Sequence, residues 1–363
     1  MWCSVVTARR LRTGLLLAAA GALFVLLLLF PEAAGNGVRR GLSVCGQLLI
    51  PSLFPFLVLT GFLIRSGLLK RLSRVFEPLM RRVFGFSGEA AAAVLLSMLG
   101  GYPTGAAAVA GLLQREEISV EEGRRLLRCA VNAGPAFVIG GIGVGMLGSV
   151  EAGLLLLVAH LTASLITSLC ERAPAVPHTS LPSPAVPLGS AVQDSLHAAT
   201  ESLLSMCSFV LLASTGLSLF DALCTLPPHS LWRCLFSGVL EVSTGCLEAA
   251  SAGELAPFLI GAMLGFGGLA VHGQIAAVTS RFHLLDRGFL RARLLHALLG
   301  GTLSFLLFRW FPPPNAAVAA LASLSAFHKG NTAVSATALL ALMLLCILFL
   351  QTLPDTENRR FRA

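Results

Sequence analysis

An acidic residue, Glu241, lies inside the apolar run 235–245, beside Ser243 and Thr244. At membrane depth an ionised carboxylate costs roughly 2.5–3.5 kcal/mol, so such residues are usually retained for a function. Glu241 could bind a cation or a proton, or accept a hydrogen bond from a ligand, and the two hydroxyls could add contacts. Alternatively, Glu241 reaches water at the mouth of a helical hairpin.

A second candidate site is the sequence GGYPTG, which interrupts the apolar segment 89–113. Glycine lets the backbone approach other groups closely, and a helix restarting after a break exposes N–H groups with partial positive charge. Such a helix start suits an anionic or polar ligand. The chain's one tyrosine, Tyr102, lies in this break. The alternative is a packing notch with a kinked tip.

Two further polar groups lie next to glycine-rich stretches. Asn132 precedes Gly134 and Pro135, and Pro135 frees a carbonyl one turn earlier because it lacks an N–H. The Asn132 amide could bind a ligand or satisfy that carbonyl. His272 and Gln274 follow a Gly-Gly pair and are either ligand contacts or polar residues at a loop end.

The candidate substrate-binding residues share a position at or beside these breaks. They are Gly100, Gly101, Tyr102, Pro103, Thr104, Gly105, Asn132, Pro135, Glu241, Ser243, Thr244, Gly245, His272 and Gln274. The sequence contains no GxSxG, HExxH or P-loop spacing, so we expect no enzyme activity. The nine cysteines form no CxxC pair, and we expect neither a metal site nor a cofactor.

Composition determines which elements position these residues. The chain has 363 residues, of which 55% are hydrophobic and 12% are charged, and its mean hydropathy is +0.82. A soluble protein carries about 25% charged residues, so this chain must be embedded in a lipid bilayer. The net charge of +8 comes from arginines beside apolar runs, which favours orientation in a membrane over nucleic-acid binding.

Apolar runs of about 20 residues predict an all-α, multi-pass membrane protein of the cell membrane. We expect an N-terminal signal-anchor helix in 1–35, followed by a Pro-rich linker at 171–194 and a C-terminal transmembrane helix with a basic tail at 312–363. Between them lie the segments 40–170 and 195–311. The prolines at 51 and 55 should bend or open the helix that contains them.

The segments 40–170 and 195–311 share an order of features that suggests an internal repeat. Each contains an interrupted segment, 89–113 in the first and 232–251 in the second, then a glycine-rich span and a plain span. If both interrupted segments return to the side they enter, the repeat is inverted and the four arginines of 114–128 lie inside, as the positive-inside rule favours. If both cross, this loop lies outside and the repeats run parallel. We favour about eight transmembrane helices plus two re-entrant helical hairpins.

At these motifs the sequence resembles a known family. PSLFPF at 51–56, GGYPTGA at 100–106 and the stretch around Asn132 and Phe137 are similar to the YlbJ-type sporulation integral membrane proteins, of the nucleoside-recognition (Gate) domain group. The resemblance covers about residues 40–350, which makes the two segments Gate-like repeats. It implies a role in forming the spore cortex but no established substrate.

Together these features favour a transporter-like protein that binds or moves a small polar solute across the bilayer. The alternative is a non-transporting membrane scaffold for spore-envelope assembly, which would use the arginine-rich segment 65–88. Nucleic acid is not an expected partner, and the sequence leaves open whether the chain forms an oligomer.

Overall fold

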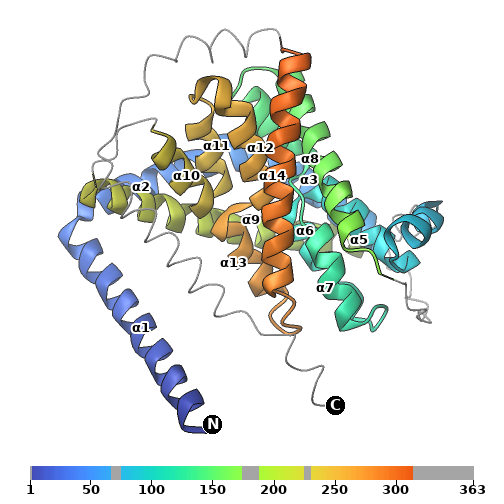
Figure 1. Ribbon diagram of the computed structural model, residues 1–363, viewed down its shortest axis with the longest axis horizontal. Coiled ribbons are helices and arrows are strands. Elements are labelled where there is room, and N and C mark those ends of the chain that lie inside the picture. The colour runs from blue at the N-terminus through green and yellow to red at the C-terminus, as the bar shows by residue number, and fades with distance from the viewer. Residues whose placement is uncertain (1, 67–74, 174–187, 225–229, 314–363) are drawn as a thin grey trace.

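The computed structural model describes residues 2–66, 75–173, 188–224 and 230–313. Within these ranges every regular element is a helix (Figure 1). The all-helical class predicted from the apolar runs is therefore confirmed for the described part of the chain. The expected C-terminal helix and tail, 312–363, and most of the Pro-rich linker lie outside the described residues.

The first helix stands away from the others. α1 (Trp2–Leu29) projects from the body of the molecule in Figure 1, and α2 (Pro31–Val44) turns back toward it. The axes of Leu17–Leu29 and Pro31–Gln47 differ by 98°. Pro31 is the first residue of α2, where its missing N–H costs no helical hydrogen bond. The expected segment 1–35 thus contains α1 and the start of α2.

The helix that carries the two prolines is opened rather than broken. A π-helix, η1 (Cys45–Leu49), lies directly before Pro51, and α3 (Ile50–Arg65) then continues through Pro55. A proline removes one donor and crowds the carbonyl four residues earlier. The carbonyl crowded by Pro51 belongs to Gln47, inside the wide π turns. The sequence-based expectation of an opened helix is met there.

The interrupted segment 89–113 forms a helical hairpin. α5 (Gly88–Gly100) and α6 (Tyr102–Gln114) are separated by Gly101, whose φ of 84° favours glycine. The N–H of Ser87 donates to Oε1 of Glu122 at 2.7 Å. Because Glu122 lies in α7 (Val120–Cys129), soon after α6 ends, α5 begins near the level at which α6 ends.

The second interrupted segment folds back in the same way. α9 (Leu188–Leu223) leads to α10 (Leu231–Leu240) and α11 (Val242–Ala249), with Glu241 between them. Nε of Arg233, near the start of α10, lies 3.0 Å from Oε1 of Glu248, near the end of α11. This bond brings the two ends of the segment together, so Glu241 is at the tip of a hairpin. α9 begins at Leu188, before the expected start of the segment 195–311.

Two long helices pack side by side in opposite directions. They are α8 (Val150–Cys170) and α14 (Arg287–Trp310). Arg128 donates to Glu171, which follows α8, at 2.7 Å and to Asp286, which precedes α14, at 2.6 Å. The end of α8 and the start of α14 therefore meet. The remaining elements are η2 (Met80–Phe84), η3 (Ala136–Val144), η4 (Gly253–Leu255), α12 (Ala256–Phe266) and α13 (Gly268–Val278).

The described helices form two packed groups. α2, α3 and α9 contact one another, and Gly37 of α2 leaves no room for a Cβ beside the backbone of Thr215 in α9. In the second group α12 packs against α14, where Gly265 faces the backbone of His296. Small residues allow such close approach, which drives helix association in membranes. We call α2, η1, α3 and α9 the side bundle and the remaining elements from α5 onward the core bundle.

The chain is a multi-pass membrane protein. Four helical segments of the described residues are long and apolar enough to cross a bilayer: Val150–Cys170, Gly189–Leu223, Gly253–Val278 and Arg287–Trp310. The bent pair of α1 and α2 raises the number to five if it counts as one span. This is fewer than the eight predicted. The segment at η3 contains too short a regular helix to be counted, and the expected last span lies outside the described residues.

Candidate functional site

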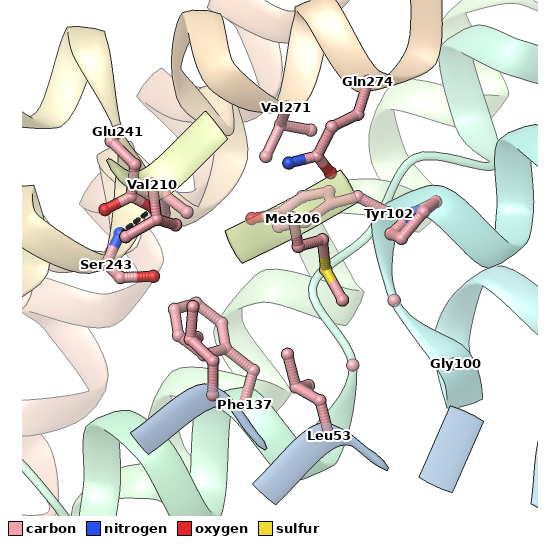
Figure 2. Close-up of a pocket in the computed structure, with 15 residues that line it drawn as sticks. Leu53, Gly100, Tyr102, Phe137, Met206, Val210, Glu241, Ser243, Val271 and Gln274 are labelled. Atoms are coloured by element: carbon pink, nitrogen blue, oxygen red, sulfur yellow. Dashed lines mark hydrogen bonds between the residues drawn. The ribbon is translucent and has the colours of Figure 1, made fainter. Parts of the chain in front are cut away.

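The tips of the two hairpins face one cavity. In Figure 2, Glu241 and Ser243 lie on one side of this space, and Gly100 and Tyr102 lie on the other. The cavity is about 50 Å³, enough for several waters, since one needs about 10–15 Å³. Its lining, which we call the chamber, is Leu49, Leu53, Gly100, Gly101, Tyr102, Pro103, Gly134, Phe137, Met206, Val210, Glu241, Val242, Ser243, Val271 and Gln274.

Glu241 caps the helix that follows it. Its carboxylate accepts hydrogen bonds from the N–H of Ser243 at 2.8 Å, the N–H of Thr244 at 2.7 Å and the hydroxyl of Thr244 at 2.9 Å. A carboxylate at a helix start satisfies free N–H groups and offsets the positive end of the helix dipole. This explains how a 3% exposed acid is tolerated. A carboxylate has about four lone-pair positions, so one remains for a further donor.

The first hairpin presents the opposite polarity. No side chain caps the start of α6, whose N-cap is Gly101, so free N–H groups of its first turn remain beside the chamber. Thr104 instead donates back to the carbonyl of Gly100 at 3.0 Å. The Tyr102 hydroxyl donates to the carbonyl of Leu264 at 2.7 Å, which fixes this tip against α12. One tip therefore offers donors, and the other offers an acceptor.

Two polar side chains remain available inside the chamber. Gln274 is 5% exposed and Ser243 is 2% exposed, and Figure 2 shows the Gln274 amide directed into the space between the tips. Among the described residues, neither the Gln274 amide nor the Ser243 hydroxyl has a hydrogen-bond partner. Buried polar groups normally have one. Both groups can therefore bind a solute or water.

The rest of the chamber is apolar and was not expected from the sequence. Leu53 of α3 and Met206 and Val210 of α9 face the hairpin tips from the side bundle, and Phe137 of η3 completes the wall. Met206 and Val210 share a helix face because they are four residues apart. That spacing is a weak signal, since any buried helix has it. Gly134, between two of the expected residues, was also missed.

The other expected residues support the chamber from behind. Asn132 donates to the Ser97 hydroxyl and to the Cys129 carbonyl, both at 2.9 Å, whereas the carbonyl one turn before Pro135, that of Val131, accepts from Arg293. Thr244 is used in the cap of α11. The remaining four are Pro135, which is the N-cap of η3, Gly105, which packs against Ala130, Gly245, which packs against Gly238, and His272, whose Nε2 lies 2.9 Å from the Phe266 carbonyl.

A buried arginine joins the backbones behind the chamber. Arg293 of α14 is 0% exposed and donates to the carbonyls of Val131 at 2.5 Å, Arg128 at 2.6 Å and Gly265 at 3.5 Å. These carbonyls lie where α7 and α12 end, and the negative ends of helix dipoles stabilise a cation. Arg293 is therefore a core residue.

Arg128, at the end of α7, forms two ion pairs where α8 ends and α14 begins. Burial by itself lowers the pKa of its guanidinium, but the bonds to Glu171 and Asp286 outweigh this effect and raise the pKa overall. Arg128 therefore stays charged at any physiological pH. Elsewhere in the described ranges, no three His, Cys, Asp or Glu side chains are grouped as a metal site would require.

Comparison with known proteins finds a family match for part of the chain. Residues 48–223 match the Gate family model, described as nucleoside recognition. The sporulation integral membrane protein YlbJ of Bacillus subtilis (strain 168) is 27% identical over 324 residues, which cover 78% of this chain and 79% of that protein. The resemblance indicated by the motifs is thereby confirmed. No solved structure matches the chain.

The residues that match the Gate family model contain only one side of the chamber. They include the first hairpin and the apolar wall formed by Leu53, Met206 and Val210. The match ends with α9, before the second hairpin begins. Glu241, Ser243 and Gln274 therefore lie outside the matched residues, although they supply the acid, hydroxyl and amide groups of the chamber.

Proposed function

We propose that this chain is a transporter-like sporulation membrane protein that binds a small polar solute in the chamber and moves it across the bilayer. The meeting of two interrupted segments at one cavity, into which Glu241, Ser243 and Gln274 bring polar groups, carries this proposal. The name of the Bacillus subtilis relative supports a role in sporulation, and we extend it to formation of the spore cortex. The chamber would act by binding, without enzymatic chemistry.

The proposed architecture is an inverted repeat with eight crossings and two re-entrant hairpins. α8 and α14 are antiparallel, and each follows an interrupted and a glycine-rich segment. Equivalent helices in inverted halves should have this relation. Both hairpins fold back, as re-entry requires. With the arginine-rich ends inside, Arg128, Glu171 and Asp286 lie at the inner face.

The chamber would then lie near the middle of the bilayer. Gly265, behind the chamber, packs against His296, which is ten residues after Asp286 in the sequence. At 1.5 Å per residue this is about 15 Å, half of a hydrocarbon core of about 30 Å. Solutes are bound at this depth in transporters built from repeats.

The polar groups suit an uncharged solute with both donors and acceptors. Glu241 can accept from the solute, the start of α6 can donate to it, and Gln274 can do either. An anion would be repelled by Glu241, and a cation by the free N–H groups of α6. The present cavity of about 50 Å³ is below the 300–1,000 Å³ of typical ligand pockets, so binding would require the chamber to open.

Spore formation in Bacillus subtilis lacking YlbJ tests this proposal. We expect the wild-type chain to restore spores with a normal cortex, and Glu241→Gln to reduce this at equal protein levels. Glu254→Gln is the matched control, because Glu254 is exposed outside the chamber. Normal complementation by Glu241→Gln combined with Gln274→Ala would refute the chamber as the site.

A scaffold function is the second candidate. It is favoured by Arg81 and Arg82, which are exposed on η2 and could bind anionic lipids or partner proteins. In this case replacing both with Gln should abolish complementation, whereas the chamber variants should be normal. The transporter proposal predicts the reverse result for both sets of variants.

A further inference from the structure

A seam between α9 and the second hairpin leads from the chamber to the end of the molecule opposite Arg128. At chamber level, Val210 of α9 lies beside Glu241 and Ser243 in Figure 2. Farther along, the rings of Phe220 and Phe236 are stacked with centroids 4.3 Å apart. Between the chamber and this end, the second hairpin thus meets α9 through this aromatic pair, whereas α9 packs more extensively against α13 of the core bundle.

An arginine closes the outer end of the seam. Arg233 of α10 donates to Asp221 at the end of α9 and, at 3.0 Å, to Glu248 at the end of α11. The side chains of Arg233, Asp221 and Glu248 are 11%, 25% and 17% exposed. Arg40 of α2 lies 3.9 Å from the same Asp221. Among the described side chains, Arg233–Asp221 is the ion pair that joins the side bundle to the core bundle.

The Arg233 bridge lies between the chamber and the outer end of the second hairpin. Arg233 precedes Glu241 by eight residues, which is about 12 Å along α10. The stacked Phe236 lies between them in the sequence. A solute approaching from this side would therefore meet the ion pairs first, then the two rings and finally the chamber. At the inner end, where Arg128 bridges Glu171 and Asp286, no ion pair among the described residues involves α9.

We propose that the Arg233 bridge and the Phe220–Phe236 pair form the outer gate of the chamber. While Asp221 holds Arg233, the second hairpin stays against α9 and the chamber is closed to the outside. Release of the bridge lets the hairpin separate from α9 along the apolar seam. This inference rests on the proposed function, because it assumes that the chamber receives a solute.

The Arg128 bridge supplies a matched control. Each arginine joins two carboxylates from different elements, at 2.7 and 2.6 Å for Arg128. The Arg128 bridge, however, lies within the core bundle and does not contact α9. Asp221→Asn and Glu171→Gln each remove one carboxylate charge with little change in size. Only Asp221→Asn should affect access to the chamber.

Cysteine labelling tests the gate. Ser243→Cys is introduced after the nine native cysteines are replaced, and intact cells are treated with a membrane-impermeant maleimide. We expect Asp221→Asn to increase the labelling rate roughly fivefold, the population change expected from loss of one partly exposed ion pair. Phe236→Ala should also increase the rate. Glu171→Gln should leave it unchanged, and Arg233→Lys should give an intermediate rate because it keeps the charge.

Three results would refute the outer gate, and they differ in whether they also refute the chamber and the transport proposal. Equal rates in Asp221→Asn and its parent, with Ser243→Cys still labelled, would refute the gate and leave the chamber standing. Equal increases in Asp221→Asn and Glu171→Gln would indicate general loosening and would also refute it. No labelling of Ser243→Cys in any variant, from cells or inverted vesicles, would refute both the gate and the transport proposal. Size-exclusion profiles of each variant verify that it is folded.

Discussion

The imidazole of His160 stacks on that of His296, with ring centroids 4.5 Å apart and an angle of 26° between the planes. His160 lies in α8 and His296 in α14, the two antiparallel helices. His160 is 11 residues before Glu171, and His296 is ten residues after Asp286. The two residues therefore lie at matching levels along α8 and α14. In the proposed inverted repeat, the two-fold axis that relates the two halves would pass between them.

The hydrogen bonds of this pair predict unequal effects of mutation. Nε2 of His160 accepts from the N–H of Ala133 at 2.9 Å, whereas Nε2 of His296 lies 3.1 Å from the His160 carbonyl. His160→Phe leaves a buried N–H without an acceptor, which costs about 1–3 kcal/mol. His296→Phe should cost less, because a carbonyl within a helix keeps its helical partner. Thermal unfolding in detergent measures both, and an equal loss would contradict the assignment.

Two glycines of α6 should differ in their tolerance of a methyl group. A Cβ at Gly105 would lie 2.0 Å from the carbonyl oxygen of Ala130, but at Gly111 the nearest atom is the end of Arg115 at 3.5 Å. Gly105→Ala should therefore separate the hairpin from its support and destabilise the protein by about 2 kcal/mol or more. Gly111→Ala should stabilise the helix by up to about 1 kcal/mol. Unfolding temperatures of both variants check this prediction, and a stable Gly105→Ala would contradict it.

Substitutions of Arg293 and Arg291 should differ in their effect on stability. Arg291 is exposed, whereas Arg293 is buried and bonded to backbone carbonyls. Arg293→Met leaves the carbonyls of Val131 and Arg128 unsatisfied, and we expect a loss of about 2 kcal/mol or more. Arg291→Met should change stability by less than about 0.5 kcal/mol. The yield of monodisperse protein and its melting temperature measure the difference, and similar values for both variants would argue against a structural role for Arg293.

Accessibility from the two sides of the membrane tests the inverted repeat. Glu116 follows the first hairpin and Glu254 follows the second, and both are exposed. If the hairpins re-enter, a cysteine at 116 should react only from the inside and one at 254 only from the outside. Each serves as the positive control for the other. Labelling of position 116 from the outside would mean that the first segment crosses the bilayer and that the halves run parallel.

The sequence was informative where structure depends on local chemistry. Glycine at 101 and the acid at 241 marked both hairpin tips, since a positive φ and a carboxylate at a helix start are local requirements. The chamber wall was not predictable in this way. Leu53 and Met206 are ordinary apolar residues of distant segments, and only tertiary packing brings them together. The buried position of Arg293 was not predictable either, because its partners are backbone carbonyls, which leave no mark in the sequence.

The tyrosine ring at the first hairpin tip is the only phenol in the chain, and it lines the chamber while its hydroxyl is held by α12. Selective isotope labelling of tyrosine would therefore produce a single NMR signal arising from this one location. Its chemical shift would follow occupancy of the cavity directly, without any engineered probe. The protein thus contains its own spectroscopic reporter at the position where a solute would arrive.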